Sequence, residues 1–177
     1  MTPATDEQGK LDDLFAATYK ELRHLAFVVK GRDKSVTLNP TALVHEAWLK
    51  MSNSPGLVAT SQLHFKRIAA RAMRQVLIEA ARRKKRLKRG GESQTVVITT
   101  DSLEAPTALA ENELLTLDLV LEELARMNPR QAMIVESRFF GGLEFAEVAE
   151  LLEISEATVF RDWRAARAWL ELEMRKT

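Results

Sequence analysis

The sequence predicts an all-α protein of two small helical domains joined by a flexible linker, the second of them a helix-turn-helix domain. Apolar residues recur at helical spacing along nearly all of the 177 residues, and the few Gly and Pro lie mostly between these periodic segments. Residues 1–100 contain 18 basic and 9 acidic side chains, whereas residues 101–177 contain 8 and 16. A charge division of this size favours two units, one of which has a polyanionic partner.

The first unit is predicted to span residues 1–89 and to contain three helices. Asn39 is a suitable N-cap for the second of them, and Pro40 suits a first helical position. The third carries an apolar stripe that includes Phe65, and Arg and Lys occupy its other faces. These helices are expected at about 8–30, 40–52 and 61–89.

Residues 90–106 are predicted to form the linker. The stretch 95–100 has β propensity, but no second strand is available to pair with it, so we expect an extended tether. The second unit, residues 107–177, is predicted to contain four helices, separated by Asn128-Pro129, by Gly141-Gly142 and by a three-residue turn. They are expected at about 107–127, 129–140, 144–152 and 156–174.

Several classes of function are excluded or disfavoured by composition. The absence of cysteine excludes disulfides, thiolate zinc sites, iron–sulfur clusters and a cysteine nucleophile. The three histidines lack ligand spacing, and there is no phosphate-binding Gly loop or HExxH motif, so we expect no metal, no cofactor and no enzymatic activity. No apolar run approaches the roughly 18 residues of a membrane span, which favours a cytoplasmic protein without membrane contact.

A helix-turn-helix pattern occupies residues 144–170. Ala149 is small where the two helices approach each other, Ile154 anchors the turn and Ser155 is an N-cap for the second helix. An inward face is expected at Val159, Trp163, Ala166 and Leu170. The outward face, which in such motifs enters the major groove, is predicted to comprise Thr158, Phe160, Arg161, Arg164 and Ala165, with Arg167 near its edge.

A strongly basic segment precedes the linker. Residues 61–89 hold 11 basic side chains and 1 acidic one, and seven of the eight residues 82–89 are basic. A basic run can be only a solvated helix face, but this density favours a nucleic-acid partner.

Three stretches of the chain together resemble a bacterial RNA polymerase sigma factor of the extracytoplasmic-function (ECF) group of the sigma-70 family. Residues 41–50 (TALVHEAWLK) are similar to the family's polymerase-docking helix. Residues 65–83 are similar to its promoter-melting helix, which reads the minus-ten element. Residues 124–170, with Asn128-Pro129-Arg130 and the helix-turn-helix, are similar to its domain that reads the minus-thirty-five element.

The resemblance implies the partners and their contact residues. Core RNA polymerase and promoter DNA, both duplex and melted, would be partners, and an anti-sigma factor could be a third. The loop 53–64 falls where the family holds a flipped-out base. Polymerase contacts fall on Leu43, Glu46, Ala47 and Lys50, although Leu43 and Ala47 would be core residues if the helix is simply amphipathic. DNA contacts on the basic helix fall on Arg71, Arg74, Gln75, Arg82 and Arg83.

The role of Phe65 is left open by the sequence. Phe65 is the only aromatic residue in 61–89 and lies on the apolar stripe, so it could be a core residue rather than a stacking platform.

Two alternative functions also remain open. An autonomous helix-turn-helix regulator, with N-terminal helices that dimerise or sense a signal, is the main alternative function. A nucleic-acid-processing accessory factor that uses the basic helix alone is a third. We also expect that the acidic stretch 101–155 could fold against the basic helix in the free chain.

Overall fold

The computed structural model describes residues 3–30, 39–54, 59–87 and 111–176. Every regular element in these ranges is an α-helix, which confirms the predicted all-α class. The predicted linker, residues 90–106, lies outside the described residues, as do 55–58 of the loop expected to hold a base and the end of the basic run from Lys88 onward. No helix in the described part of the chain is long and apolar enough to cross a membrane.

The first unit forms three helices near the positions expected from the sequence. Asn39 caps α2 as predicted, because its side chain accepts a hydrogen bond from the Ala42 backbone N–H at 2.7 Å, and Pro40 is the first helical residue. The helices are α1 (Pro3–Lys30), α2 (Pro40–Ser52) and α3 (Gln62–Leu87).

The second unit forms four helices. Asn128 caps the second of these by accepting a hydrogen bond from the Gln131 backbone N–H at 3.2 Å, and Pro129 opens it. The helices are α4 (Glu111–Met127), α5 (Pro129–Phe139), α6 (Phe145–Leu152) and α7 (Glu156–Met174).

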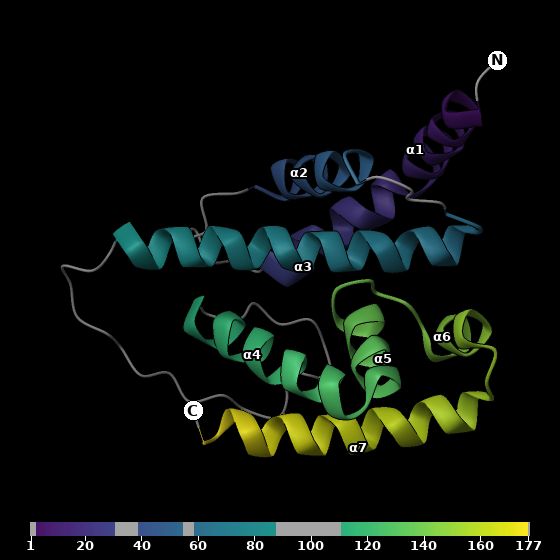
Figure 1. Cartoon of the computed structure of the whole chain (residues 1–177). Helices are drawn as coiled ribbons and strands as arrows, with labels where there is room; N and C mark the ends of the chain where they lie inside the picture. The colour runs from purple at the N-terminus through teal and green to yellow at the C-terminus, as the bar shows by residue number, and fades with distance from the viewer. Residues whose placement is uncertain (1–2, 31–38, 55–58, 88–110, 177) are drawn as a thin grey trace.

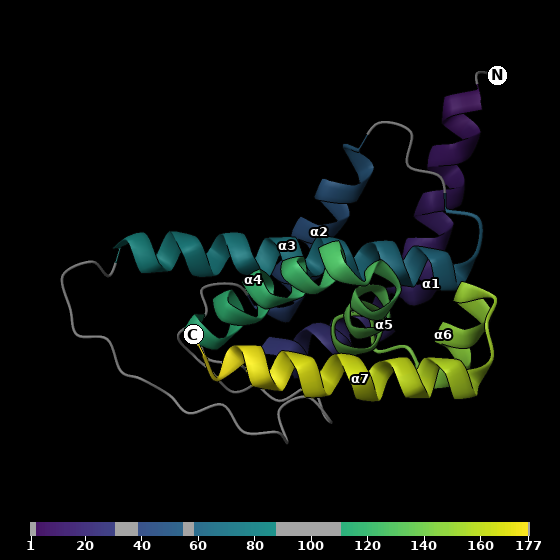
Figure 2. The ribbon, with the colours of Figure 1, turned by 60° about the horizontal axis from the view of Figure 1, so that its bottom comes forward.

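Helix α3 lies at the centre of the molecule, between α2 on one side and the second unit on the other, and α1 crosses behind it (Figure 1). Helices α4 and α5 lie between α3 and α7 in both views (Figure 1 and Figure 2). Because α3 is covered on two sides, the buried apolar side chains of both units form one continuous core. Of the predicted apolar stripe, Phe65, Ala69, Ala72 and Val76 are buried, whereas Ile68 and Ala80 are half-buried. A second row is also buried, at Ala70, Met73, Leu77 and Ala81.

Two adjacent glycines allow the turn after α5 to lie close to the first unit. A Cβ added at Gly141 would lie 2.8 Å from Leu143 Cδ1 and 3.1 Å from Ala70 Cβ on α3. Gly142 has a φ of +63°, and an added Cβ would lie 3.1 Å from Leu25 Cδ1 on α1. The predicted helix-ending role of this pair is therefore combined with a role in packing, because larger residues would push the turn away from α1 and α3.

Candidate nucleic-acid interface

Helices α6 and α7 form the predicted helix-turn-helix. Helix α6 ends at Leu152, and its C-cap residue, Glu153, has a left-handed φ of 53° and reverses the chain toward α7. Ser155 caps α7 as predicted, since its hydroxyl accepts a hydrogen bond from the Thr158 backbone N–H at 3.2 Å. The inward face of α7 is buried as expected, at Val159, Trp163, Ala166 and Leu170.

The predicted outward face of α7 is brought together on one side of the helix. Phe160, Arg161, Arg164 and Ala165 are exposed, whereas Thr158 and Arg167 are half-buried at its edges. This side carries positive charge and one large aromatic ring, so it can offer both phosphate and base-edge contacts to a duplex.

An aromatic and cationic stack supports this face from behind. The Phe160 ring meets Phe145, the first residue of α6, edge-to-face at 5.5 Å between centroids. Phe145 also meets Trp163 at 6.2 Å, and the Arg138 guanidinium lies 3.7 Å from the centre of the Phe145 ring. Burial lowers the pKa of Arg138 from its ordinary value, while the Glu144 carboxylate 3.7 Å away favours the charged form.

An ion pair between the exposed Arg130 and the buried Asp162 joins α7 to the start of α5. The Arg130 Nε donates to the Asp162 carboxylate at 2.6 Å, and the Asp162 side chain is almost fully buried. Since Asp162 lies between Arg161 and Trp163, this pair helps to set the rotation of α7 about its axis. That rotation decides which residues face outward.

The candidate DNA contacts on α3 are divided between solvent and the second unit. Arg71, Gln75 and Arg83 are exposed and available to a partner. Arg74 has only 14% of its side chain exposed, because its guanidinium binds the Asp118 carboxylate of α4 at 2.8 and 3.0 Å and Glu136 of α5 at 3.0 Å. Arg82 contacts the same Asp118 carboxylate at 3.1 Å. We refer to Arg74, Arg82, Asp118 and Glu136 as the Arg74 ion-pair cluster.

A second charged contact ties the two units together at the other end of α3. Lys66 Nζ lies 2.6 Å from a Glu21 carboxylate oxygen on α1 and 3.4 Å from Glu147 on α6. Burial favours the neutral amine, but the hydrogen bonds and charges of Glu21 and Glu147 outweigh it and raise the pKa of Lys66. The ammonium therefore stays charged at neutral pH.

A cationic cleft of about 440 Å³ lies between α2 and α3. Lys50, Arg67, Arg71 and His64 line it together with the polar side chains of Ser54 and Gln75. Glu136 of the Arg74 ion-pair cluster also lines the cleft, so a carboxylate from α5 lies at its edge. Its cations and hydrogen-bonding groups suit an anionic, polar ligand such as the backbone and base of a single nucleic-acid strand.

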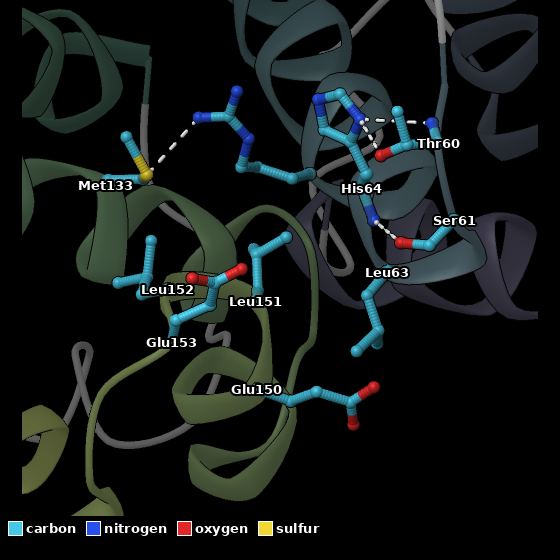
Figure 3. Close-up of a pocket in the computed structure, with 10 residues that line it drawn as sticks. Thr60, Ser61, Leu63, His64, Met133, Glu150, Leu151, Leu152 and Glu153 are labelled. Atoms are coloured by element: carbon cyan, nitrogen blue, oxygen red, sulfur yellow. Dashed lines mark hydrogen bonds between the residues drawn. The ribbon is translucent and has the colours of Figure 1, made fainter.

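A neighbouring cleft of about 430 Å³ separates the first turn of α3 from the end of α6 (Figure 3). On one side, the His64 imidazole accepts a hydrogen bond from the Thr60 backbone N–H at 3.3 Å, and the Ser61 hydroxyl accepts one from the His64 backbone N–H at 3.1 Å. On the other side lie Met133, Leu152 and Glu153. Burial and the positive charge of Arg67 lower the pKa of His64, so its ring is neutral at pH 7.

Helix α2 presents fewer docking candidates than the resemblance implied. Leu43 and Ala47 are 1% and 3% exposed, so both belong to the core, as the amphipathic interpretation anticipated. Glu46 is exposed, and Lys50 forms an ion pair with Glu79 of α3 at 2.7 Å. Leu49 was absent from the predicted set but is 52% exposed on the same side as Glu46. The position of Leu49, three residues after Glu46 and off the apolar stripe of α2, was a signal that the sequence contained.

The structure also bears on the role of Phe65 and on possible metal ligands. Phe65 is completely buried, so in this structure it is a core residue and not an exposed stacking platform. Among the residues that the structure describes, no group of three or more His, Asp or Glu side chains could hold a metal ion.

The partners of Arg74 were missed at the residue level. Asp118 and Glu136 lie 44 and 62 positions from Arg74 in the chain, and both are ordinary acidic residues within amphipathic helices. Only the excess of acid in the second unit indicated that carboxylates were available to meet the basic helix.

Three comparisons with known proteins bear on the family of this chain, and one of them found a match. Neither a search of curated proteins nor a search of solved structures found a match to this chain. A family model described as ECF sigma factor matches residues 5–176, which is nearly the whole chain. This match includes the basic helix α3, the docking candidate α2 and the helix-turn-helix. The chain therefore belongs to the ECF sigma factor family, whose members are non-enzymatic factors of transcription initiation.

Proposed function

We propose that this sigma factor binds core RNA polymerase, directs it to promoters and helps to open the DNA. The observation that supports this most is that one chain carries two separate cationic surfaces of different shape, an exposed helix face and a cleft. The outward face of α7 suits the major groove of a duplex, whereas the cationic cleft between α2 and α3 suits a single strand. An initiation factor needs both, because it meets the promoter first as duplex and then as melted DNA.

The two units would divide this work between them. In the second, residues 107–177, the outward face of α7 would read the minus-thirty-five element through Arg161, Arg164 and Phe160 and their neighbours Thr158, Ala165 and Arg167. In the first, residues 1–89, Arg71, Gln75 and Arg83 would contact the minus-ten region. Arg74 and Arg82 would join them once Asp118 and Glu136 move away.

Core polymerase would dock on the exposed side of α2, which carries Glu46 and Leu49. The polymerase supplies the chemistry in this scheme. An anti-sigma factor, the third partner that the family resemblance implies, would regulate the protein by covering these same surfaces.

The arrangement of the free chain supports weak DNA binding in the absence of polymerase. Arg74 and Arg82 are occupied by carboxylates of the second unit, and Glu136 lies at the edge of the cationic cleft. We propose that core polymerase holds the two units apart at the promoter spacing. The second DNA contact then becomes intramolecular, and affinity can rise by about 10²–10⁴-fold.

A gel-shift series with and without core RNA polymerase tests the proposal. At physiological salt we expect the purified chain to bind promoter DNA weakly and with little sequence preference, because phosphate contacts alone are sequence-independent. Addition of core polymerase should produce tight, promoter-specific binding. Tight specific binding by the purified protein alone, above all as a dimer on a palindrome, would instead favour an autonomous regulator.

A further inference from the structure

Phe160 is unusual among the residues of the outward face of α7. Its side chain is 49% exposed, and its neighbours on this face, Arg161 and Arg164, are charged. An apolar ring on a surface proposed to face the groove suits an apolar group of the DNA, whereas the two arginines beside it suit phosphates and polar base edges.

The other side of the Phe160 ring packs against an aromatic neighbour on α6. Phe145 meets it edge-to-face at 5.5 Å, with an angle of 76° between the ring planes. Phe145 is fixed in turn by Trp163 and by the Arg138 guanidinium, which donates a hydrogen bond to the Leu143 carbonyl at 3.0 Å. A side chain that is already ordered loses little conformational entropy when it meets a ligand.

We propose that Phe160 reads the 5-methyl group of thymine in the upstream promoter element, an inference that rests on the proposed function. A phenyl ring cannot exchange hydrogen bonds with base edges. Of the groups that the four bases display in the major groove, the thymine methyl is the apolar one, and Phe is among the side chains that contact it. Arg161 and Arg164, which follow Phe160 on the same face, would supply phosphate or guanine contacts next to this position.

The experiment uses holoenzyme reconstituted from the full chain and core polymerase. Sequences bound from a pool randomised across the upstream element first define the base preferences. Each selected thymine is then replaced in turn by deoxyuridine, which removes only the methyl group. At one or two positions the wild-type affinity should fall about fourfold, as expected for loss of one buried methyl contact.

Variants of Phe160 connect this effect to the ring. Phe160→Ala should bind the thymine and deoxyuridine probes equally, while Phe160→Leu, which keeps an apolar side chain, should retain part of the difference. Arg161→Ala is the matched control on the same face, and it should lose affinity for both probes while keeping their ratio. Helical content and melting temperature of each variant establish that the fold is intact.

Several results would overturn the inference. One is a selected element without a thymine preference, and another is a wild-type holoenzyme that binds its promoter specifically but is insensitive to deoxyuridine at every position. In both cases the proposed sigma-factor function would stand. Loss of core polymerase binding by Phe160→Ala in the absence of DNA would assign the ring to a protein contact. Failure of the holoenzyme to bind any sequence specifically would remove the proposed function and this inference together.

Discussion

Glu153 has a backbone conformation that glycine adopts more easily than a residue with a side chain. It adopts a left-handed φ of 53°, where a Cβ is unfavourable by about 1–2 kcal/mol. Glycine avoids this penalty but loses about 0.5–1 kcal/mol of backbone entropy on folding. The side chain is exposed, so its removal exposes no core.

We therefore expect Glu153→Gly to raise the free energy of unfolding by about 0.5–1 kcal/mol and the melting temperature by a few degrees. Thermal unfolding followed by circular dichroism measures this. The matched control is Glu150→Gly, an exposed glutamate inside α6, which should instead lose about 1 kcal/mol as glycine does within helices. If both variants lose the same free energy of unfolding, the left-handed conformation of Glu153 is not strained.

Arg161 and Arg164 provide a residue-scale test of the recognition helix. Each alanine substitution should cost about 1–3 kcal/mol of holoenzyme affinity for the upstream element if the arginine makes a bidentate base contact. The melting temperature should change little, because both side chains are exposed and face away from Val159 and Trp163. Arg126→Ala, at an exposed arginine of α4, is the control for lost charge. A large fall in melting temperature would mean that these side chains pack inward.

The role of a single residue could be predicted from the sequence where its partner lies close to it in the chain. Asn39 and Ser155 were predicted as caps because the donor that each satisfies lies three residues further along. Asn128 was predicted only as part of a helix break, although it caps α5 with the same three-residue spacing. The burial of Arg74 could not be predicted in this way. Its carboxylate partners are brought close only by tertiary packing, and its own neighbours along α3 resemble those of any basic helix.

At the scale of elements, the helix order and most boundaries followed from periodicity, whereas the number of buried faces on α3 did not. Its sequence shows one clear stripe because Arg and Lys are interspersed on the other sides. The second buried row consists of Ala70, Met73, Leu77 and Ala81, in which two small alanines weaken the apolar signal. Small residues there allow Gly141 and the turn after α5 to approach closely.

Helix α2 was correctly placed, but two of its predicted docking residues are buried and one exposed residue was not predicted. Leu43 and Ala47 point into the core, so substitutions there would test folding rather than docking. Lys50 is also unsuitable as a docking probe, because its reversal would break the ion pair with Glu79 that joins α2 to α3. The exposed side with Glu46 and Leu49 is what a partner can reach.

The double variant Glu46→Lys with Leu49→Asp should weaken binding of core polymerase by at least about 1–2 kcal/mol without loss of helical content. Removal of an exposed apolar anchor mainly increases the dissociation rate, and reversal of a rim charge mainly changes the association rate and its salt dependence. Surface plasmon resonance with immobilised core polymerase measures both rates. Glu122→Lys on the exposed side of α4 is the control, and unchanged kinetics in the double variant would place the docking surface elsewhere.

For the whole molecule, the sequence indicated opposite charges in the two units but not how the units meet. The structure brings them together through α3, with a shared core, the Arg74 ion-pair cluster and Lys66 between Glu21 and Glu147. The expected contact of the acidic stretch with the basic helix is present in this arrangement. It places three carboxylates of the second unit on cations of α3.

Asp118→Asn tests whether the Arg74 ion-pair cluster keeps the units together. The substitution removes the negative charge that meets both Arg74 and Arg82. Arg74 remains largely buried as long as the two units are packed together, an arrangement that we call closed. A buried cation that loses a carboxylate partner costs about 1–3 kcal/mol, whereas in an open chain the same guanidinium is hydrated. The equilibrium should therefore shift by about 5- to 150-fold toward an open arrangement, in which the two units are separated.

Small-angle scattering of the free chain should then show a larger radius of gyration for Asp118→Asn than for the wild type, with unchanged helical content. Affinity of the free chain for duplex DNA should rise, and its salt dependence should steepen, because Arg74 and Arg82 become available to phosphates. Glu122→Gln changes the net charge equally on an exposed position of the same helix, so it isolates the effect of the cluster from that of charge alone. If both variants have the wild-type radius and the same small gain in DNA affinity, the cluster does not hold the two units together, and the shared apolar core alone closes the molecule.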